Sequence, residues 1–198
     1  MKLRPYQLLA SQAIMASWQQ HDSALAVMPT GTGKTVLFSD VIRRVFPRKA
    51  LVLAHRAELI HQAKDKIQRV TGYRVEVEMA ALRADLNAGL FASPQVIVSS
   101  IQTQTAGGDG GGRMAKFDPM MFGVLIIDES HHATAKSYRR VIDYYRQNPR
   151  LKVLGVTATP DRADEEALGQ VFEHVAFDYE ILDAIRDGWL VPIDQQTV

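Results

Sequence analysis

The chain has 198 residues, of which 46% are hydrophobic, and this suits one α/β domain with a sizeable core better than two very small domains. Its 23 basic and 22 acidic residues leave a net charge of +1, so no global field attracts polyanions, and any nucleic-acid contact must come from a local patch. The absence of cysteine excludes disulfides and thiolate metal sites, and no apolar run approaches the ~20 residues that span a bilayer, so we expect no membrane partner and a cytoplasmic location.

The first predicted element is an amphipathic helix that begins near Pro5. Apolar side chains recur at helical spacing from Tyr6 to Trp18, and proline is favoured in the first turn of a helix. The sequence Leu-Arg-Pro-Tyr-Gln leads into this helix and ends at Gln7. This element resembles the Leu-Arg-x-Tyr-Gln element of several superfamily 2 helicases, and the resemblance implies that Gln7 contacts the edge of an adenine base. An amide suits that contact because it offers a donor and an acceptor together, whereas Gln7 taken alone is more simply a polar helix residue.

A strand, a glycine turn and a helix follow in direct succession. The apolar run 24–27 predicts a buried strand, and the turn reads Met-Pro-Thr-Gly-Thr-Gly-Lys-Thr over residues 28–35. Its glycines permit positive φ, so successive backbone N–H groups can point at an anion. Lys34 then supplies positive charge for the β- and γ-phosphates of a nucleotide, and Thr35 supplies a hydroxyl for Mg²⁺. The strict phosphate-loop pattern has glycine where this chain has Met28, and a loop that merely turns the chain is the alternative.

The alternation of helices and strands continues behind this loop. A helix over residues 36–45 ends before Pro47, and the apolar run 50–54 predicts a fully buried strand. The next helix begins within the sequence His-Arg-Ala-Glu-Leu-Ile-His-Gln, residues 55–62. These elements complete a β-α-β unit, which is the building block of a parallel sheet.

Small polar residues follow one of the next two strands. Residues 73–77 alternate as a half-exposed strand, and residues 95–99 predict a buried one that leads into Ser-Ser-Ile-Gln-Thr-Gln-Thr at 99–105. Hydroxyls and amides at a strand end suit phosphate and sugar contacts, and an N-cap into a short helix explains the same residues equally well. Five glycines then lie within residues 107–112, which predicts a surface loop over 106–113 and no domain boundary.

An acidic pair follows the apolar strand predicted at residues 124–127. The sequence there is Asp-Glu-Ser-His, residues 128–131. Asp128, at the tip of a buried strand, can hold Mg²⁺ opposite the phosphate loop, while Glu129 can orient and deprotonate an attacking water. Such a pair is common by chance, but a pair about 95 residues behind a phosphate loop in a β/α chain is not.

The remaining predicted elements are a helix, a strand and a second helix. The helix over residues 138–145 is followed by a strand at 152–156, which leads into Thr-Ala-Thr-Pro at 157–160. A tail helix with apolar residues from Ile181 onwards is stopped by Gly188. Strand ends with polar sequences behind them thus recur along the whole chain.

Together these segments resemble the first RecA-like lobe of superfamily 2 helicases, from Leu3 to Ile193. The phosphate loop is similar to motif I of that superfamily, and residues 55–62 are similar to motif Ia. The Asp-Glu-Ser-His tetrad is similar to the DExH form of motif II, and Thr-Ala-Thr-Pro is similar to motif III. The resemblance implies an α/β, RecA-like phosphate-loop fold, with a mainly parallel sheet, helices on both faces and a single lobe over residues 1–198.

The resemblance also implies a role for each matching side chain. The catalytic residues are expected to be Lys34, Asp128, Glu129 and His131. Nucleotide contacts are expected from Gln7, Thr30, Gly31, Thr32, Gly33, Lys34 and Thr35, and metal contacts from Thr35 and Asp128. Nucleic-acid contacts are expected from Arg56, Gln102 and Thr103, and coupling between the two sites from Thr157 and Thr159. For Arg56 a solvated charge at a helix start is an equal alternative to a bidentate phosphate contact.

The implied function is ATP hydrolysis that drives movement along DNA or its unwinding, with ATP and Mg²⁺ as cofactors. The elements Leu-Arg-Pro-Tyr-Gln, Asp-Glu-Ser-His and Thr-Ala-Thr-Pro-Asp-Arg are more similar to DNA translocases, including XPB-type repair helicases and restriction-enzyme motor subunits, than to DEAD-box RNA helicases. The alternatives are an RNA-remodelling ATPase and a nucleotide-dependent DNA-binding switch, although a switch has no need of the hydrolytic base Glu129. Motifs IV to VI, which carry arginine fingers, are not in these residues, so we expect a second RecA-like lobe of the same polypeptide as a partner.

Overall fold

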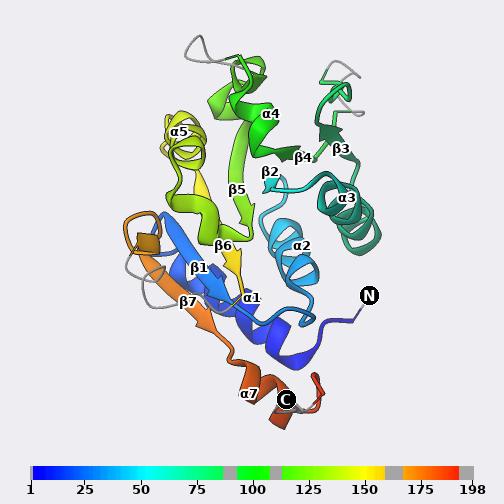
Figure 1. Ribbon diagram of the computed structural model, residues 1–198, viewed down its shortest axis with the longest axis vertical. Coiled ribbons are helices and arrows are strands. Elements are labelled where there is room, and N and C mark those ends of the chain that lie inside the picture. The colour runs from blue at the N-terminus through cyan, green and yellow to red at the C-terminus, as the bar shows by residue number, and fades with distance from the viewer. Residues whose placement is uncertain (1, 87–92, 108–112, 159–166, 192–198) are drawn as a thin grey trace, which may run out of the picture.

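The computed structural model describes residues 2–86, 93–107, 113–158 and 167–191 (Figure 1). The strands are β1 (Ser23–Val27), β2 (Lys49–Ala54), β3 (Val75–Glu78), β4 (Val96–Ser100), β5 (Phe122–Asp128), β6 (Lys152–Thr157) and β7 (His174–Asp178). Within the described residues they form one sheet in the order β3-β4-β2-β5-β6-β1-β7, in which every neighbouring pair is parallel. The expected parallel α/β architecture is confirmed.

Helices cover both faces of this sheet. They are α1 (Pro5–Ser17), α2 (Lys34–Arg44), α3 (Ala57–Thr71), α4 (Ile101–Thr105), α5 (Lys136–Tyr145) and α7 (Ile181–Arg186), with short 3-10 helices η2 (Arg113–Lys116), η3 (Pro119–Met121) and η4 (Ser130–Thr134). The first three pack on one face and α4 and α5 on the other (Figure 1). Among the described residues, no helix is both long enough and apolar enough to cross a membrane.

Strand β2 illustrates why the central strands read as unbroken apolar runs. Its side chains alternate between the two faces, and each face is covered. Ala50, Val52 and Ala54 enter the core beneath α1, α2 and α3, whereas Leu51 and Leu53 enter the core beneath α4 and α5. All five are fully buried. Full burial of one leucine stabilises a fold by about 1.5–3 kcal/mol. The buried central strands therefore fix the positions of the loops that follow them.

Strand β7 is an element that the sequence pattern did not predict. It pairs in parallel with β1 at the edge of the sheet, with a shift in register between Leu25 and Ala26. Its side chains are largely exposed, and Val175 is 53% exposed. An edge strand that buries so little needs only a short apolar run, here residues 175–177, and that run is too short to predict a strand.

The carboxyl ends of five strands bring the predicted motifs to one edge of the sheet. The phosphate loop follows β1 and residues 55–56 follow β2, while β4, β5 and β6 end at Ser100, Asp128 and Thr157. Because neighbouring strands are parallel, these five ends all lie on the same edge. The topology therefore gathers motifs that are far apart in the sequence.

Candidate functional site

The phosphate loop has the backbone conformation that its glycines were expected to provide. Gly31 and Gly33 have φ of 85° and 83°, in the left-handed region, and Gly33 is the N-cap of α2. A Cβ on Gly33 would lie 2.7 Å from Nε2 of Gln7, so any larger residue there would collide with that side chain. The loop delivers the chain into the first turn of α2, where unpaired N–H groups and the helix dipole favour an anion.

Two residues of α1 form hydrogen bonds to the backbone of the phosphate loop. The Tyr6 hydroxyl donates a 2.7 Å hydrogen bond to the carbonyl oxygen of Thr32, and Nε2 of Gln7 donates to the same oxygen at 2.9 Å. Oε1 of Gln7 accepts from the backbone N–H of Arg4 at 3.0 Å. Both ends of the Gln7 amide are thus occupied in this structure, so its adenine contact stays a prediction. Sequence reasoning missed Tyr6, whose spacing marked it only as a core residue.

A cavity of about 580 Å³ opens in front of the loop. Predicted residues from two strand ends line it, namely Thr30, Gly31, Gly33, Lys34, Thr35, Asp128 and Glu129. A second wall comes from α3 and was not predicted; it consists of Leu59, Gln62, Asp65, Lys66 and Arg69. These positions recur at helical spacing on one side of α3. The sequence shows that stripe, but only the packing of α3 against α2 reveals that it faces the loop.

Lys34 and Glu129 meet inside this cavity. Lys34 is 9% exposed, and its Nζ lies 3.7 Å from Oε1 of Glu129 and 3.5 Å from the carbonyl oxygen of Met28. A buried ammonium needs such partners, because desolvation without compensation is costly. A negatively charged ligand at the loop would compete for the same ammonium group.

Asp128 is poised to accept a cation. Burial and, to a smaller extent, the negative charge of Glu129 raise the pKa of its carboxyl group from the ordinary 3.8 to about 6, against the opposing effects of Lys34 and of the backbone N–H of Glu129. A bound divalent cation would stabilise the charged form of Asp128, which burial and the nearby charge of Glu129 both disfavour. The Thr35 hydroxyl and the Asp128 carboxylate line the same cavity, and they are the oxygen donors that Mg²⁺ prefers when it also keeps waters and substrate phosphate. These residues therefore fit that ion.

Glu129 connects the cavity to the end of β6. Its backbone has φ of 54°, a left-handed conformation that is strained for a residue with a side chain. Oε2 of its carboxylate lies 3.5 Å from Nδ1 of His131, which is in turn 3.2 Å from Oγ1 of Thr157. The expected link between the acidic tetrad and the end of β6 thus has a geometric basis. The other predicted coupling residue, Thr159, lies outside the described residues.

The expected nucleic-acid contacts occupy different environments. Arg56 is exposed at the N-cap of α3, and Gln102 is exposed on α4. Thr103 is 6% exposed, and its hydroxyl accepts a 2.8 Å hydrogen bond from Ser100. Ser100 also caps α4 by accepting from the backbone N–H of Thr103, which realises the N-cap alternative. Of the three predicted contacts, Arg56 and Gln102 are accessible in this structure.

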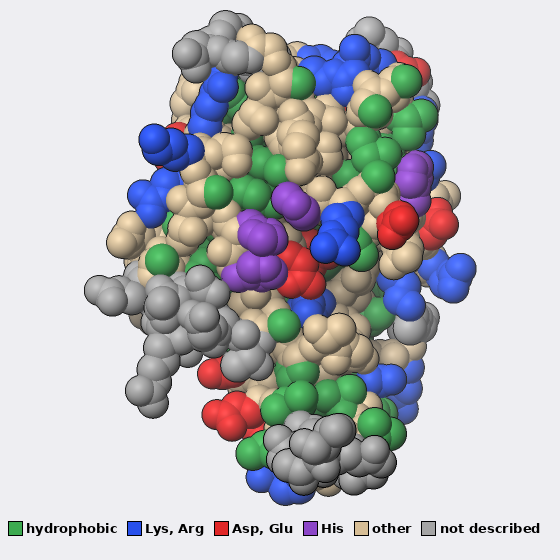
Figure 2. Space-filling view, in the orientation of Figure 1, with side chains coloured by type: hydrophobic (Ala, Val, Ile, Leu, Met, Phe, Trp, Pro, Cys, Tyr) green, Lys and Arg blue, Asp and Glu red, His purple; other side chains and the backbone are tan. Residues whose placement is uncertain are grey.

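Histidine side chains gather beside the acidic tetrad on the same face (Figure 2). The ring of His132 lies 4.1 Å from that of His131 and 4.9 Å from that of His55, measured between centroids. His55 follows β2, whereas the other two follow β5. The strand ends that carry the nucleic-acid and nucleotide candidates are therefore in direct contact.

Residues 1–162 match the model of a family described as "Type III restriction enzyme, res subunit". The chain belongs to this family. It is 33% identical over 202 residues to IRC3 of Saccharomyces cerevisiae, a protein named for ATP-dependent helicase activity, and the match covers 95% of this chain and 28% of the yeast protein. It is 26% identical over 163 residues to the DNA 3'-5' translocase XPB2 of Sulfurisphaera tokodaii, and this match covers 82% of this chain and 32% of that protein. The chain thus spans less than a third of the length of these relatives.

The fold is similar to part of the type ISP restriction-modification enzyme LlaGI, solved as a nuclease-deletion mutant in complex with a DNA substrate mimic. The TM-score is 0.71 at 20% sequence identity, over 96% of this chain and 21% of that chain. With the family match, this confirms the expected resemblance to the first RecA-like lobe of superfamily 2 helicases.

Proposed function

We propose that this family member is the ATP-binding lobe of a helicase or translocase that hydrolyses ATP to move along or unwind DNA. The observation that carries the proposal is one cavity that brings the phosphate loop together with Asp128 and Glu129. Binding of phosphates requires N–H groups and a cation, whereas hydrolysis also requires a group that activates water. The walls of this cavity provide both kinds of group.

ATP would bind with its phosphates on the loop and over the first turn of α2. The positive φ of Gly31 and Gly33 turns the backbone so that N–H groups can face the phosphates. The ammonium of Lys34 would leave Glu129 and contact the β- and γ-phosphates, where the negative charge is greater. Thr35 and Asp128 would hold Mg²⁺, which supplies positive charge to the phosphate oxygens.

Hydrolysis would use the carboxylate that Lys34 leaves. Glu129 would orient a water and accept its proton while the water oxygen bonds to the γ-phosphorus and the bond to the bridging oxygen breaks. The same carboxylate lies beside His131, which contacts Thr157. Loss of the γ-phosphate would therefore change the partners of Glu129 and, through His131, the end of β6. Because a switch that only binds nucleotide has no need of a hydrolytic base, the position of Glu129 in this cavity favours a motor.

DNA is the polymer that the comparisons support best. One relative is named a DNA translocase, and a structural neighbour was solved with a DNA substrate mimic. The exposed Arg56 at the carboxyl end of β2 would contact the phosphate backbone, which carries no base information. We expect a second RecA-like lobe to complete the nucleotide site, since the relatives are more than three times as long as the part that this chain matches.

The test is ATP hydrolysis by the chain joined to its second lobe, with single-stranded DNA, duplex DNA or RNA added. Stimulation by DNA and not by RNA is the expected result. Stimulation by RNA alone would favour the RNA-remodelling alternative, and nucleotide binding without hydrolysis under any of these conditions would favour the switch. The variant Lys34→Ala is the control, because it removes the phosphate contact without touching the predicted nucleic-acid contacts.

A further inference from the structure

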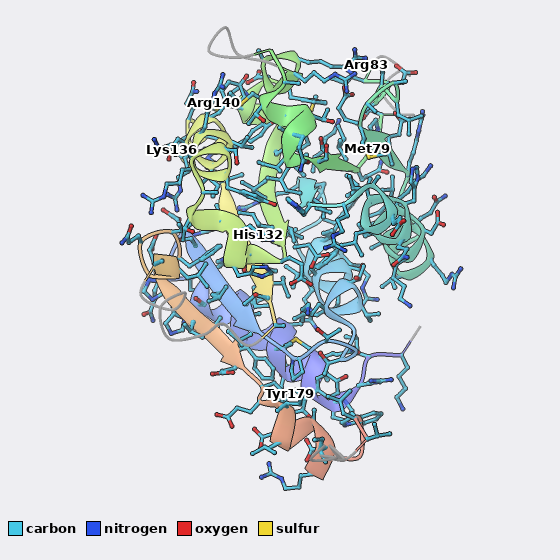
Figure 3. All side chains as sticks on the ribbon, in the orientation of Figure 1. Met79, Arg83, His132, Lys136, Arg140 and Tyr179 are labelled. Carbon is cyan, nitrogen blue, oxygen red and sulfur yellow. The ribbon has the colours of Figure 1, made fainter. Side chains whose placement is uncertain are left out.

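An aromatic cluster joins the end of the described chain to its beginning. Tyr179 lies where β7 leads into α7, close to α1 (Figure 3). Its ring stacks on that of Tyr6, with centroids 4.7 Å apart and an interplanar angle of 15°. The ring of Trp189 meets Tyr6 edge-on at 5.7 Å. Aromatic pairs of these two geometries are favourable beyond the area that they bury. Two residues of the tail thus hold the ring of Tyr6.

The hydroxyl of Tyr6 passes this restraint on to the phosphate loop. It donates to the carbonyl oxygen of Thr32 at 2.7 Å and accepts from Nη1 of Arg4 at 3.0 Å. The guanidinium of Arg4 itself lies over the Trp189 ring, with Cζ 4.7 Å from the centroid, in a cation–π contact. Trp189 therefore acts on the loop through two neighbours at once, the ring of Tyr6 and the guanidinium that bonds its hydroxyl.

The tail also touches the loop directly. A Cβ placed on Gly31 would lie 3.4 Å from Cδ2 of Leu190, so the leucine packs against the turn at that glycine. The backbone N–H groups of Trp189 and Leu190 both donate to the carbonyl oxygen of Ala184, at 2.8 and 3.1 Å. These bonds fix the turn after α7 and the direction of both side chains.

We propose that Trp189 and Leu190 are positioning residues of the nucleotide site, which hold the phosphate loop in its binding conformation through Tyr6, Arg4 and Gly31. The inference rests on the proposed function of the loop. Its physical basis is the carbonyl of Thr32: Tyr6 and Gln7 of α1, which are not among the residues that line the cavity, both donate to it and so hold this acceptor toward α1. A carbonyl that turned toward the phosphates would repel them and remove a donor. The effect is on phosphate binding, so it does not depend on the base.

The test compares Trp189→Ala with Leu182→Ala, a control that removes an apolar side chain 65% exposed on α7. Affinities are measured for Mg²⁺-ATP and for Mg²⁺-tripolyphosphate, which has no base. We expect Trp189→Ala to weaken both by a similar factor, about three- to tenfold, with a melting temperature lowered by only about 2–4 °C. Trp189→Phe should restore most of the affinity because it keeps a ring, and the control should match the wild type.

A second variant, Tyr6→Phe, tests the same restraint on the phosphate loop without removing the Trp189 side chain. Tyr6→Phe keeps the stacked ring and removes only the hydroxyl, so it should weaken both probes as well. A loss confined to ATP would overturn the inference, because it would indicate a base contact. Unchanged affinities in Trp189→Ala and Tyr6→Phe would also overturn it, provided that Lys34→Ala loses both probes. If Lys34→Ala bound both probes as the wild type does, the proposed function itself would fall.

Discussion

Lys34 and Glu129 face each other across the candidate site, with Nζ of the lysine 3.7 Å from Oε1 of the glutamate. The side chain proposed to bind phosphate is therefore paired with the side chain proposed to activate water. A γ-phosphate placed on the loop would take the ammonium and leave the carboxylate available as a base. Such an exchange would couple nucleotide binding to activation of the proposed base, and mutation of each residue alone tests the two roles separately.

Lys34→Ala should abolish measurable binding of Mg²⁺-ATP. Removal of the ammonium leaves the clustered phosphate charges without their nearest monovalent counter-charge, and Thr35 offers only a hydroxyl in its place. Isothermal titration with ATP is the measurement. Lys66→Ala serves as the matched control, because it removes the same ammonium from another wall of the cavity. Wild-type affinity in the Lys34 variant would remove the basis for assigning the loop.

Glu129→Gln should bind ATP at least as tightly as the wild type and yet hydrolyse it about 10²- to 10⁴-fold more slowly. The amide keeps the shape of the side chain but cannot accept the proton of water, and it no longer holds Lys34 in an ion pair. Asp65→Asn, the same chemical change on the α3 wall, should leave the rate nearly unchanged. Binding by titration and phosphate release in the two-lobed protein would separate the effects. A wild-type rate in the Glu129 variant would assign the base elsewhere.

Arg56→Ala should weaken DNA binding by a similar factor for all sequences and lower the salt slope of log K by about one unit. The reason is the loss of one phosphate contact, which releases about one fewer counterion. Arg150→Ala is the control. This arginine is also exposed, but it precedes β6 and so lies at the amino ends of the parallel strands, away from Arg56 at their carboxyl ends. Fluorescence anisotropy at several salt concentrations gives the slope. An unchanged slope in the Arg56 variant would identify Arg56 as a solvated charge.

Asp40→Asn should lower the free energy of unfolding at pH 7 by about 2 kcal/mol. Asp40 is 1% exposed and accepts from Ser11 of α1 at 2.7 Å and from Arg43 and Arg44 at 2.6 Å each. Burial by itself would raise the pKa of the Asp40 carboxyl group, but these hydrogen bonds outweigh it and hold the pKa below its ordinary value.

The sign of the pH dependence follows from that lowered pKa. Because the folded state favours the charged carboxylate, its contribution to stability is present above about pH 4 and is lost as pH falls through the lower folded pKa. The difference between wild type and Asp40→Asn should therefore shrink toward pH 3 in urea titrations. Asp143→Asn, an exposed aspartate on α5, should show no such trend. A difference that is constant with pH would contradict the charged form of Asp40.

The sequence predicts most of the fold because its central strands are covered on both faces. Apolar runs such as residues 50–54 and 124–127 mark those strands, and a parallel sheet then places their ends together. The edge strand β7 escaped prediction because Val175 and its neighbours bury too little to leave a pattern. The left-handed backbone of Glu129 is likewise invisible in sequence, since only the surrounding packing imposes it.

The site divides in the same way. Candidate residues that a motif identifies by their chemistry, such as Lys34 and Asp128, could be predicted from the sequence, and the structure places both in one cavity. The proposed role of Trp189 could not be predicted from the sequence, because it depends on the contacts of its ring with Tyr6 and Arg4 in the folded chain. Thr103 shows the converse, since its hydroxyl suits a phosphate contact but is already bonded to Ser100.

The last prediction is that the 198-residue chain folds by itself and yet turns over ATP slowly. Autonomous folding is expected because its sheet is continuous and two hydrophobic cores fill both faces. Slow turnover is expected because arginine fingers that neutralise charge on the transferring phosphate are worth about 10³ to 10⁵ in rate, and the resemblance assigns such arginines to the second lobe. The chain should bind ATP weakly, show little stimulation by DNA, and gain activity when the second lobe is joined. Steady-state hydrolysis at equal rates by the chain alone and by the two-lobed protein would mean that Lys34, Asp128 and Glu129 suffice without arginines from another lobe.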